Sequence, residues 1–285
     1  MSKLTNYNSF EGKVLKEIFQ DSQIDANIAL IVESFIYKEV MEYRDDDYTD
    51  KIKQKYMTKY GEKEGIYQRL YKNGQKMFET NYKKGKEEGL YQYWFLYSEQ
   101  KQEESYYKED KRDGICKKWY DNGEIHIIIN YKEDKRDGLY QEWYINGQKK
   151  SFLFYKEGKE EGLKEEWYEN GQKEIECIYK DGKIEGLYQE WHMNGQKYAE
   201  CTYKDGKKEG LCQWWHSNGQ KCRECTYKEG KKEGLEQWWY DDGKIHIINN
   251  FKDGKDDGET KCWNIRGELT IHKIYKDGEV IEVIL

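Results

Sequence analysis

The chain has 285 residues, of which 37% are charged and 16% aromatic, and its formal net charge is −7. Its 49 Lys and Arg residues are interleaved with 56 Asp and Glu residues. The chain therefore lacks the basic stripe that tracks phosphates, and we expect no direct binding to duplex nucleic acid. The 27 Tyr and 10 Trp residues compensate for the scarcity of aliphatic side chains, because each large ring can bury roughly 150–250 Å².

The N-terminal segment MSKLTNYNSFEGKVLKEIFQ has no continuous apolar run of the kind that a secretion signal needs. The aliphatic stretch at residues 29–32 is far too short to span a bilayer. We therefore expect a soluble, cytoplasmic protein. The 7 Cys residues fit that compartment as small buried side chains, since an odd number suits a closed disulfide framework poorly. Heavy use of Lys, Glu, Asn, Tyr and Ile without Pro suggests a bacterial or phage source.

Residues 1–47 show no repeat and are predicted to form a small helical cap. Ser9 is a suitable N-cap for a first helix through Gln20, and Ser22 for a second helix to about Tyr43. The apolar residues of the second helix lie at helical spacing: Ile24, Ile28, Ile31, Val32, Phe35 and Ile36. We expect the two helices to cover the first strand edge of the following domain, and a docking module for a partner is the alternative.

A 24-residue repeat fills residues 48–285, where we expect about nine units. Each unit is marked by a Gly, at spacings of 24 residues with a single 25: Gly65, Gly89, Gly114, Gly138, Gly162, Gly186, Gly210, Gly234 and Gly258. Five residues after eight of them there is a Trp, and the first unit has Leu70 instead: Trp94, Trp119, Trp143, Trp167, Trp191, Trp215, Trp239 and Trp263. The spacing of 25 coincides with a degenerate turn at residues 97–100, which carries one extra residue.

One unit, residues 186–209, reads GLYQEWHMNGQKYAECTYKDGKKE and contains two turn dipeptides. Asn194-Gly195 and Asp205-Gly206 tolerate positive φ at both central positions of a type I′ turn, and runs rich in Tyr, Trp, Thr and Cys flank them. Each unit is therefore predicted to be a β-hairpin. The predicted fold is mainly β, an elongated and twisted antiparallel meander of repeated hairpins.

The sequence leaves the register of each hairpin open. A two-residue turn pairs Trp191 with Tyr198 and places the Trp row beside Glu200, whereas a three-residue turn pairs Trp191 with Ala199 and unites the apolar rows. Turn chemistry favours the first register, and burial of apolar side chains favours the second. In both, one sheet face is partly open, and exposed Tyr rings there would suit the binding of a macromolecule.

The segment YKDGKKEG at residues 203–210 has near copies that start at Tyr82, Tyr179 and Tyr227. It resembles the aromatic-x-x-Gly-x-x-x-Gly signature of MORN repeats, most closely the bacterial variant found in proteins labelled as putative antitoxins. The chain departs from the usual repeat in having Cys201, Cys212 and their equivalents in place of further glycines, and in its regular Trp. The resemblance implies a hairpin-ribbon fold and a role in binding proteins or membrane surfaces.

Residues that could carry chemistry recur with the repeat. Cys222 and Cys225 form a C-x-x-C pair, but on a strand they point to opposite faces, and Cys177, Cys201 and Cys225 recur as one packing row. The His residues also recur: His192 and His216 lie one repeat apart, and His126 and His246 share another slot. Catalysis needs a unique constellation of residues. We therefore expect no catalytic residue, metal or cofactor, and no chemically singular position.

Repetition without a catalytic constellation predicts a non-catalytic protein-binding scaffold that neutralises or inhibits a protein partner, such as a toxin. One alternative is a peripheral membrane or lipid-binding repeat protein, which the acidic net charge disfavours. Another is a phage or mobile-element inhibitor of a bacterial defence nuclease. The predicted contact residues are the rings that follow Trp in successive units, since wide rings make good anchors: Tyr144, Tyr168, His192, His216 and Tyr240.

Overall fold

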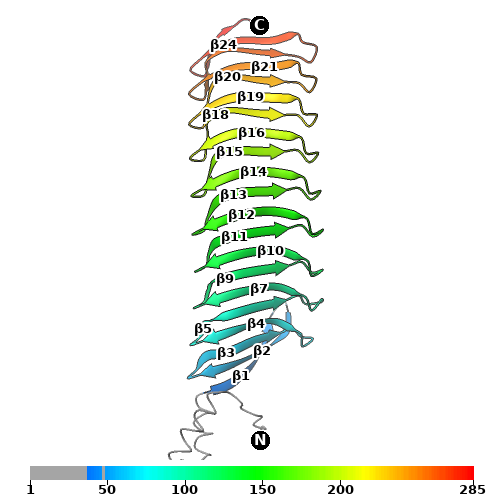
Figure 1. The fold of residues 1–285 in the computed structure, drawn as a ribbon, viewed down its shortest axis with the longest axis vertical. Helices are drawn as coiled ribbons and strands as arrows, with labels where there is room; N and C mark the ends of the chain where they lie inside the picture. Colours follow the sequence, from blue (N-terminus) through cyan, green and yellow to red (C-terminus); the bar gives the residue numbers. More distant parts are fainter. Residues whose placement is uncertain (1–36, 47–48) are drawn as a thin grey trace, which may run out of the picture. The chain divides into compact units, whose positions relative to one another are not determined.

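The computed structural model describes residues 37–46 and 49–285, and every regular element in these ranges is a β-strand. The chain forms two compact units, one ending at Gly123 and the other starting at Glu124. Within each unit, consecutive strands lie side by side in chain order and pair antiparallel (Figure 1). The predicted meander of hairpins is therefore confirmed within each unit. No helix in these ranges is long and apolar enough to cross a membrane.

In the first unit, antiparallel ladders run from β1 with β2 to β7 with β9. Its strands are β1 (Tyr37–Asp46), β2 (Thr49–Lys59), β3 (Glu62–Leu70), β4 (Lys76–Lys83), β5 (Lys86–Glu87), β6 (Gly89–Trp94), β7 (Lys101–Lys108), β8 (Lys111–Arg112) and β9 (Gly114–Trp119).

The second unit continues the same pattern with β10 (Ile125–Lys132), β11 (Lys135–Trp143), β12 (Lys149–Lys156), β13 (Lys159–Trp167), β14 (Lys173–Lys180), β15 (Lys183–Trp191), β16 (Lys197–Lys204), β17 (Lys207–Lys208), β18 (Gly210–Trp215), β19 (Lys221–Lys228), β20 (Lys231–Trp239), β21 (Ile245–Lys252), β22 (Lys255–Asp256), β23 (Gly258–Trp263), β24 (Leu269–Lys276) and β25 (Glu279–Val283). The two-residue strands are the first parts of longer strands, interrupted one residue before a repeat-marking Gly.

The two turn dipeptides of one repeat adopt different conformations. Asp205 (φ 51°) and Gly206 (φ 78°) both have positive φ, so the predicted type I′ turn between β16 and β17 is confirmed. At the other turn only Gly195 has positive φ (81°), and its N–H donates a 2.8 Å hydrogen bond to the carbonyl of His192. This is a type I turn followed by a left-handed Gly, and the type I′ prediction for Asn194-Gly195 was wrong.

The side chain of Asn194 explains the difference. Its Oδ1 accepts the N–H of Gln196 at 3.0 Å, an Asx-type contact that stabilises the turn while Asn194 itself keeps negative φ. In the type I′ turn, the N–H of Asp205 instead donates to the carboxylate of Glu185, 2.7 Å away.

The hairpin body follows the register of the two-residue turn, and the three-residue register was wrong. Glu190 lies opposite Ala199, and Tyr188 lies opposite Cys201. A bulge at the start of β16 leaves Tyr198 out of the ladder, so Trp191 pairs with Lys197. Neither predicted partner of Trp191 is therefore the observed one. The same shift recurs in other hairpins of both units.

The Gly that marks each repeat lies in a second bulge rather than in a turn. Between the pairs Cys177↔Tyr188 and Tyr179↔Ile184, three residues of β15 face one residue of β14. Gly186 is the middle one of the three and has φ +83°, a conformation that L side chains rarely adopt. The 24-residue Gly period is thus the period of this bulge.

The second predicted N-terminal helix was wrong over its last residues. It was expected to reach about Tyr43, but Tyr37–Asp46 form β1, whose backbone pairs with β2 from Tyr37↔Lys59 to Asp46↔Thr49. The segment YKEVMEYR suits a strand as well as a helix, and β2 provides a hydrogen-bonding edge that periodicity does not reveal. Strand pairing therefore starts before residue 48, the predicted start of the repeat domain. The rest of the predicted cap lies outside the described residues.

Alternate side chains of each strand point to opposite faces of the sheet. We call one the cysteine face, because its central row contains Cys177, Cys201 and Cys225, and the other the leucine face, because it carries Leu187 and its equivalents. The three cysteines are 2%, 3% and 0% exposed. Rings beside this row cover it; those of Tyr188 and Tyr203, for example, lie 5.8 Å apart.

The expectation that the cysteines are packing groups is confirmed for Cys116, Cys177 and Cys225, which are buried free thiols. Burial raises the pKa of Cys177 to about 11, so this thiol stays protonated and unreactive at neutral pH. Cys201 and Cys212 differ, because a disulfide joins them across β16 and β18.

Candidate functional site

The predicted contact residues occupy the first position of the turn that follows Trp, and they bond to the next repeat. The Tyr168 hydroxyl donates a 2.8 Å hydrogen bond to the Trp191 carbonyl, and His192 Nε2 lies 2.9 Å from the Trp215 carbonyl. Tyr144, His216 and Tyr240 make the same contact with Trp167, Trp239 and Trp263 at 2.9, 3.0 and 2.9 Å. These side chains join repeats, and their contact with a partner stays a prediction.

Asn at the turn and the acidic residue before each repeat Gly also connect neighbouring repeats. Asn194 Nδ2 donates to the Ser217 carbonyl at 2.7 Å, and Asn170 and Asn218 do the same one repeat away. The Glu185 carboxylate accepts the N–H of Asp205, and equivalent bonds recur at 20-residue spacing along the chain. Both hairpin edges are thus held by side chains that the repeat requires for its own structure.

The repeats differ from one another mainly on the cysteine face, where a repeat protein can place specific recognition. In the slot of Glu190, the second unit has Glu142, Glu166, Glu190, Trp214 and Trp238 in successive repeats. In the slot of Ala199, it has Ser151, Ile175, Ala199, Arg223 and Ile247. The face therefore changes from acidic to aromatic and basic between β15 and β18.

The aromatic and basic section is centred on Arg223 of β19. Its guanidinium carbon lies 4.4 Å from the ring centroid of Trp214 and 4.6 Å from that of Trp238. Both Trp residues pair directly with Arg223 in the ladders on its two sides. The guanidinium is thus flanked by two indole rings, an arrangement that favours a delocalised cation over an ammonium group.

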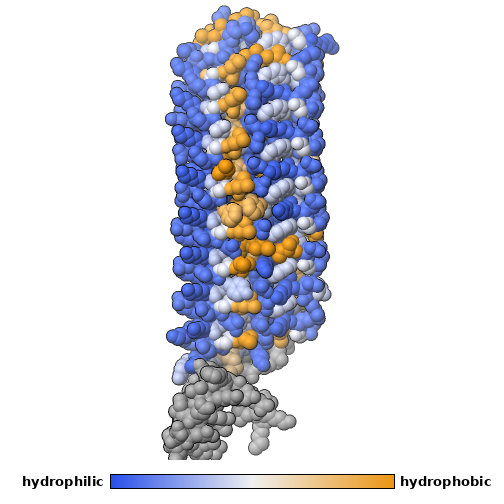
Figure 2. All heavy atoms as spheres, in the orientation of Figure 1, coloured by the Kyte–Doolittle hydropathy of each residue, from blue (hydrophilic) through white to orange (hydrophobic). Residues whose placement is uncertain are grey.

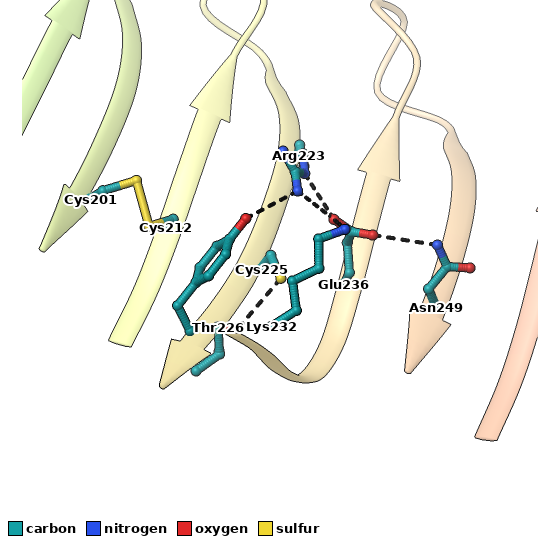
Figure 3. Close-up of polar contacts among 9 residues, drawn as sticks. Cys201, Cys212, Arg223, Cys225, Thr226, Lys232, Glu236 and Asn249 are labelled. Atoms are coloured by element: carbon teal, nitrogen blue, oxygen red, sulfur yellow. Dashed lines mark hydrogen bonds and ion pairs between the residues drawn. A yellow bond between two sulfur atoms is a disulfide. The ribbon is translucent and has the colours of Figure 1, made fainter. Parts of the chain in front are cut away.

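Glu236 neutralises this guanidinium from the next strand, β20 (Figure 3). Its Oε1 accepts hydrogen bonds from Arg223 at 2.6 and 2.9 Å and lies 2.9 Å from Lys232 Nζ. Asn249 donates to Oε2 at 3.4 Å. Although burial disfavours its charged form, the hydrogen bonds from Lys232 and Arg223 hold the pKa of Glu236 below its usual value. Glu236 is 1% exposed, so its ion pairs are shielded from solvent.

Lys208 lies beside this cluster without a counter-ion. Its Nζ lies 5.0 Å from the Trp214 ring centroid and 5.2 Å from that of Tyr227, and it has no carboxylate partner among residues 37–46 and 49–285. Partial burial, together with the nearby Arg223 charge, lowers the pKa of Lys208. Glu236 thus pairs with Arg223 and Lys232 while Lys208 stays unpaired, and the section carries excess positive charge.

The preceding repeats carry the opposite charge on the same face. Glu142 accepts hydrogen bonds from Tyr140 at 2.7 Å and Lys150 at 2.8 Å, and Glu190 accepts one from Tyr188 at 3.0 Å. The rings hold these carboxylates in place on the face. The cysteine face of the second unit therefore presents an acidic section, β11 to β15, in which Lys150 and Lys164 pair with Glu142 and Glu166, followed by a basic section, β18 to β20.

The expectation that no position is chemically singular was wrong for Arg223, whose sandwich between two Trp rings has no equivalent in the neighbouring repeats. The sequence prediction missed it because it was based on the positions that are the same in every repeat and not on those that vary. The signal was present: QWW at residues 213–215 and 237–239 interrupts the QEW of residues 189–191. Groups of His, Cys, Asp and Glu that could hold a metal do not occur among the described residues.

The family model for the MORN repeat variant matches the chain at residues 63–84, 112–133, 160–181, 184–205, 208–229 and 232–253. Each matched segment contains one bulge Gly and the type I turn that follows Trp or Leu70, and each ends at the first residue of the type I′ turn. A comparison with curated proteins found no match. The predicted resemblance to MORN repeats is thus supported at six positions along the chain.

Proposed function

We propose that this chain of MORN-type repeats is a non-catalytic protein-binding scaffold, and that the cysteine face of its second unit binds the partner. MORN repeats generally bind proteins or membranes. The observation that carries the proposal is the departure from repetition on this face, where Trp214, Arg223 and Trp238 replace the Glu and small residues of earlier repeats. Trp and Arg are the residue types that contribute most to binding energy at protein interfaces.

We expect the partner to carry a basic patch that contacts the acidic section of the face and an acidic patch that contacts the basic section. Occlusion of the partner's own active surface would neutralise or inhibit it. A toxin and a defence nuclease are both partners of this kind, and the scaffold itself needs no catalytic group for either role.

The proposal is tested by affinity purification of the full chain from its native host, with Trp214→Glu as the variant. This change gives the repeat the residue that Glu190 provides one repeat earlier, so the backbone and Arg223 have an acceptable neighbour. The matched control is Leu187→Gln with Leu211→Gln on the leucine face. We expect a stoichiometric protein partner whose recovery falls at least tenfold with Trp214→Glu only. Absence of any stoichiometric protein, or equal recovery with both variants, would count against the proposal.

A second candidate function, binding to an anionic membrane surface, is favoured by the leucine face. Figure 2 shows a narrow apolar stripe between hydrophilic borders, and within the second unit the exposed aliphatic residues include Leu163, Leu187, Leu211 and Leu235, which are 39% to 51% exposed. Lys204 and Lys207 flank the type I′ turn beside the stripe, and equivalent Lys pairs recur in other repeats. Apolar insertion with flanking Lys is the usual basis of peripheral membrane binding.

Vesicle flotation separates the two functions. Phosphatidylcholine vesicles with and without phosphatidylserine would be mixed with the wild type, with Leu187→Gln/Leu211→Gln, and with Trp214→Glu. If the protein binds membranes, the wild type should float only with vesicles that contain phosphatidylserine. The leucine-face variant should lose this flotation, and Trp214→Glu should keep it. If the wild type stays in the dense fraction with both vesicle types, membrane binding is rejected.

A further inference from the structure

Lys208 is the basis of an inference that deepens the proposed function and rests on it. We propose that Lys208, with the rings of Trp214 and Tyr227, is a binding site for one carboxylate of an acidic segment on the protein partner. The three side chains come from neighbouring strands, β17, β18 and β19, of the second unit.

The unpaired charge is the first argument. Other cations of the cysteine face have acceptors: Arg136 donates to the Tyr155 hydroxyl at 2.9 Å, and Lys232 contacts Glu236 at 2.9 Å. Lys208 occupies the slot of Arg136 and Lys232 but contacts only aromatic rings within the described chain. The carboxylate of Glu236 forms its ion pairs with Arg223 and Lys232 and does not contact Lys208. A half-buried ammonium group without an acceptor is a favourable place for an incoming anion.

The surroundings of Lys208 define what kind of anion fits. Trp214 and Tyr227 give the site apolar walls, against which the methylene groups of an Asp or Glu side chain can pack. Arg223 lies against the same Trp214 ring, but its charge is already paired with Glu236. A single carboxylate is therefore attracted by the unpaired Lys208 and shielded by two rings.

The acidic section argues for a protein segment over a nucleic acid or a phospholipid surface. Glu190 lies in the preceding repeat on the same face, roughly 10 Å from Trp214 at two strand spacings of about 4.8 Å each. A chain of phosphates that followed the face would meet the Glu190 carboxylate, which is hydrogen-bonded to the neutral Tyr188 hydroxyl, and be repelled by its charge. A protein segment avoids this by placing an acidic residue at Lys208 and basic residues further along.

Panning a random-peptide library on the full chain tests the inference. The variant is Lys208→Met, which keeps the methylene stem over the rings and removes the charge. The control is Lys204→Met, at an exposed position of the leucine face. Thermal unfolding of each variant would confirm that it folds.

We expect wild type and Lys204→Met to select peptides that share an Asp or Glu, and Lys208→Met to bind them at least tenfold more weakly. Replacing that acidic residue by its amide should weaken binding to the wild type by a similar factor and leave binding to Lys208→Met unchanged. Selection without an acidic residue, or equal binding to Lys208→Met, overturns the inference. So does Lys208-dependent binding of a single-stranded oligonucleotide or of phosphatidylserine vesicles.

The two failures are distinguishable. If a protein partner is recovered and Lys208→Met still binds it as well as the wild type does, the scaffold function stands and the carboxylate site is rejected. If Trp214→Glu leaves partner recovery unchanged, the cysteine face itself is rejected.

Discussion

The hydroxyl of Tyr168 donates a hydrogen bond to the backbone carbonyl of Trp191, which lies 23 residues later in the chain. The contact is repeated by Tyr144 and Tyr240 and, through a ring nitrogen, by His192 and His216. A side chain that was predicted to reach a partner thus has a role in holding the repeats together. Stability and binding measurements can separate the two roles.

Tyr168→Phe removes this hydroxyl and keeps the ring. We expect a loss of about 1 kcal/mol in the free energy of unfolding, because the Trp191 carbonyl loses its donor in a partly buried position. Urea denaturation measures it. The control is Tyr198→Phe, whose ring lies 5.0 Å from His192 but whose hydroxyl has no hydrogen bond in the described chain. Equal stability of both variants would show that the contact contributes nothing.

The hydrogen bond from Asn194 to the Ser217 carbonyl of the next repeat can be tested with the single variant Asn194→Asp and the double variant Asn194→Asp/Gln196→Lys. The single change keeps the Oδ1 acceptor but removes the donor to Ser217, and we expect a loss of roughly 0.5–1.5 kcal/mol. The second change should restore most of it. In the repeat that begins at Gly234, Asp242 takes the Asn slot, and Lys244 donates instead to the Ile265 carbonyl at 3.2 Å. A double variant no more stable than Asn194→Asp would exclude this compensation.

Glu236→Gln leaves Arg223 and Lys232 without their counter-ion. Because breaking a buried pair strands charge in a poorly solvated site, we expect a loss of about 3 kcal/mol at neutral pH. The pKa of Glu236 is lowered in the folded state from its ordinary value of 4.5, so its stabilising effect is complete above that pH and is lost as the pH falls through the folded pKa.

The difference in stability between wild type and Glu236→Gln should therefore be constant from pH 6 to 8 and shrink below about pH 4. Guanidinium denaturation across this range measures it. Glu200→Gln is the matched control, since Glu200 is half-exposed, and we expect it to cost less than about 1 kcal/mol. A difference that grows on acidification would contradict the assignment.

Gly206→Ala tests the type I′ turn. Gly206 has φ +78°, and an added Cβ would lie 3.4 Å from the Cβ of Lys183 in the previous turn. We expect a loss of about 1–2 kcal/mol from the left-handed conformation alone. Asp205→Asn should be close to neutral, because Asn also tolerates positive φ. Thermal unfolding of the two variants, measured side by side, checks both expectations.

The hairpin repeat was predictable from the sequence because turn dipeptides and aromatic runs act locally. Asp205-Gly206 specifies its turn by backbone preference alone, and the extra residue at 97–100 is visible by counting. The structure confirms that count, since six residues separate the paired Trp94 and Lys101, whereas five separate Trp191 and Lys197.

The strand bulges, the hydrogen bonds between neighbouring repeats and the cluster around Arg223 could not be predicted from such local signals. Gly186 has the same signature in a bulge as in a turn, because both need only positive φ. The choice of register depended on where Tyr198 leaves the ladder, which is a cooperative property of two strands. Arg223 and Glu236 lie 13 residues apart, and only the folded register places them in contact.

The bonds that join one repeat to the next have fixed sequence separations, 23 residues from Tyr168 to Trp191 and 20 from Glu185 to Asp205. Deleting residues 162–185, which is one whole repeat, would join Glu161 to Gly186. Each remaining donor of these inter-repeat hydrogen bonds would then find an acceptor in the equivalent position of its new neighbour. A gene with this organisation can gain or lose copies by unequal recombination at little local cost to the product. An insertion of any other size must be absorbed in a loop, as at residues 97–100, where Glu99 takes the left-handed conformation (φ 54°).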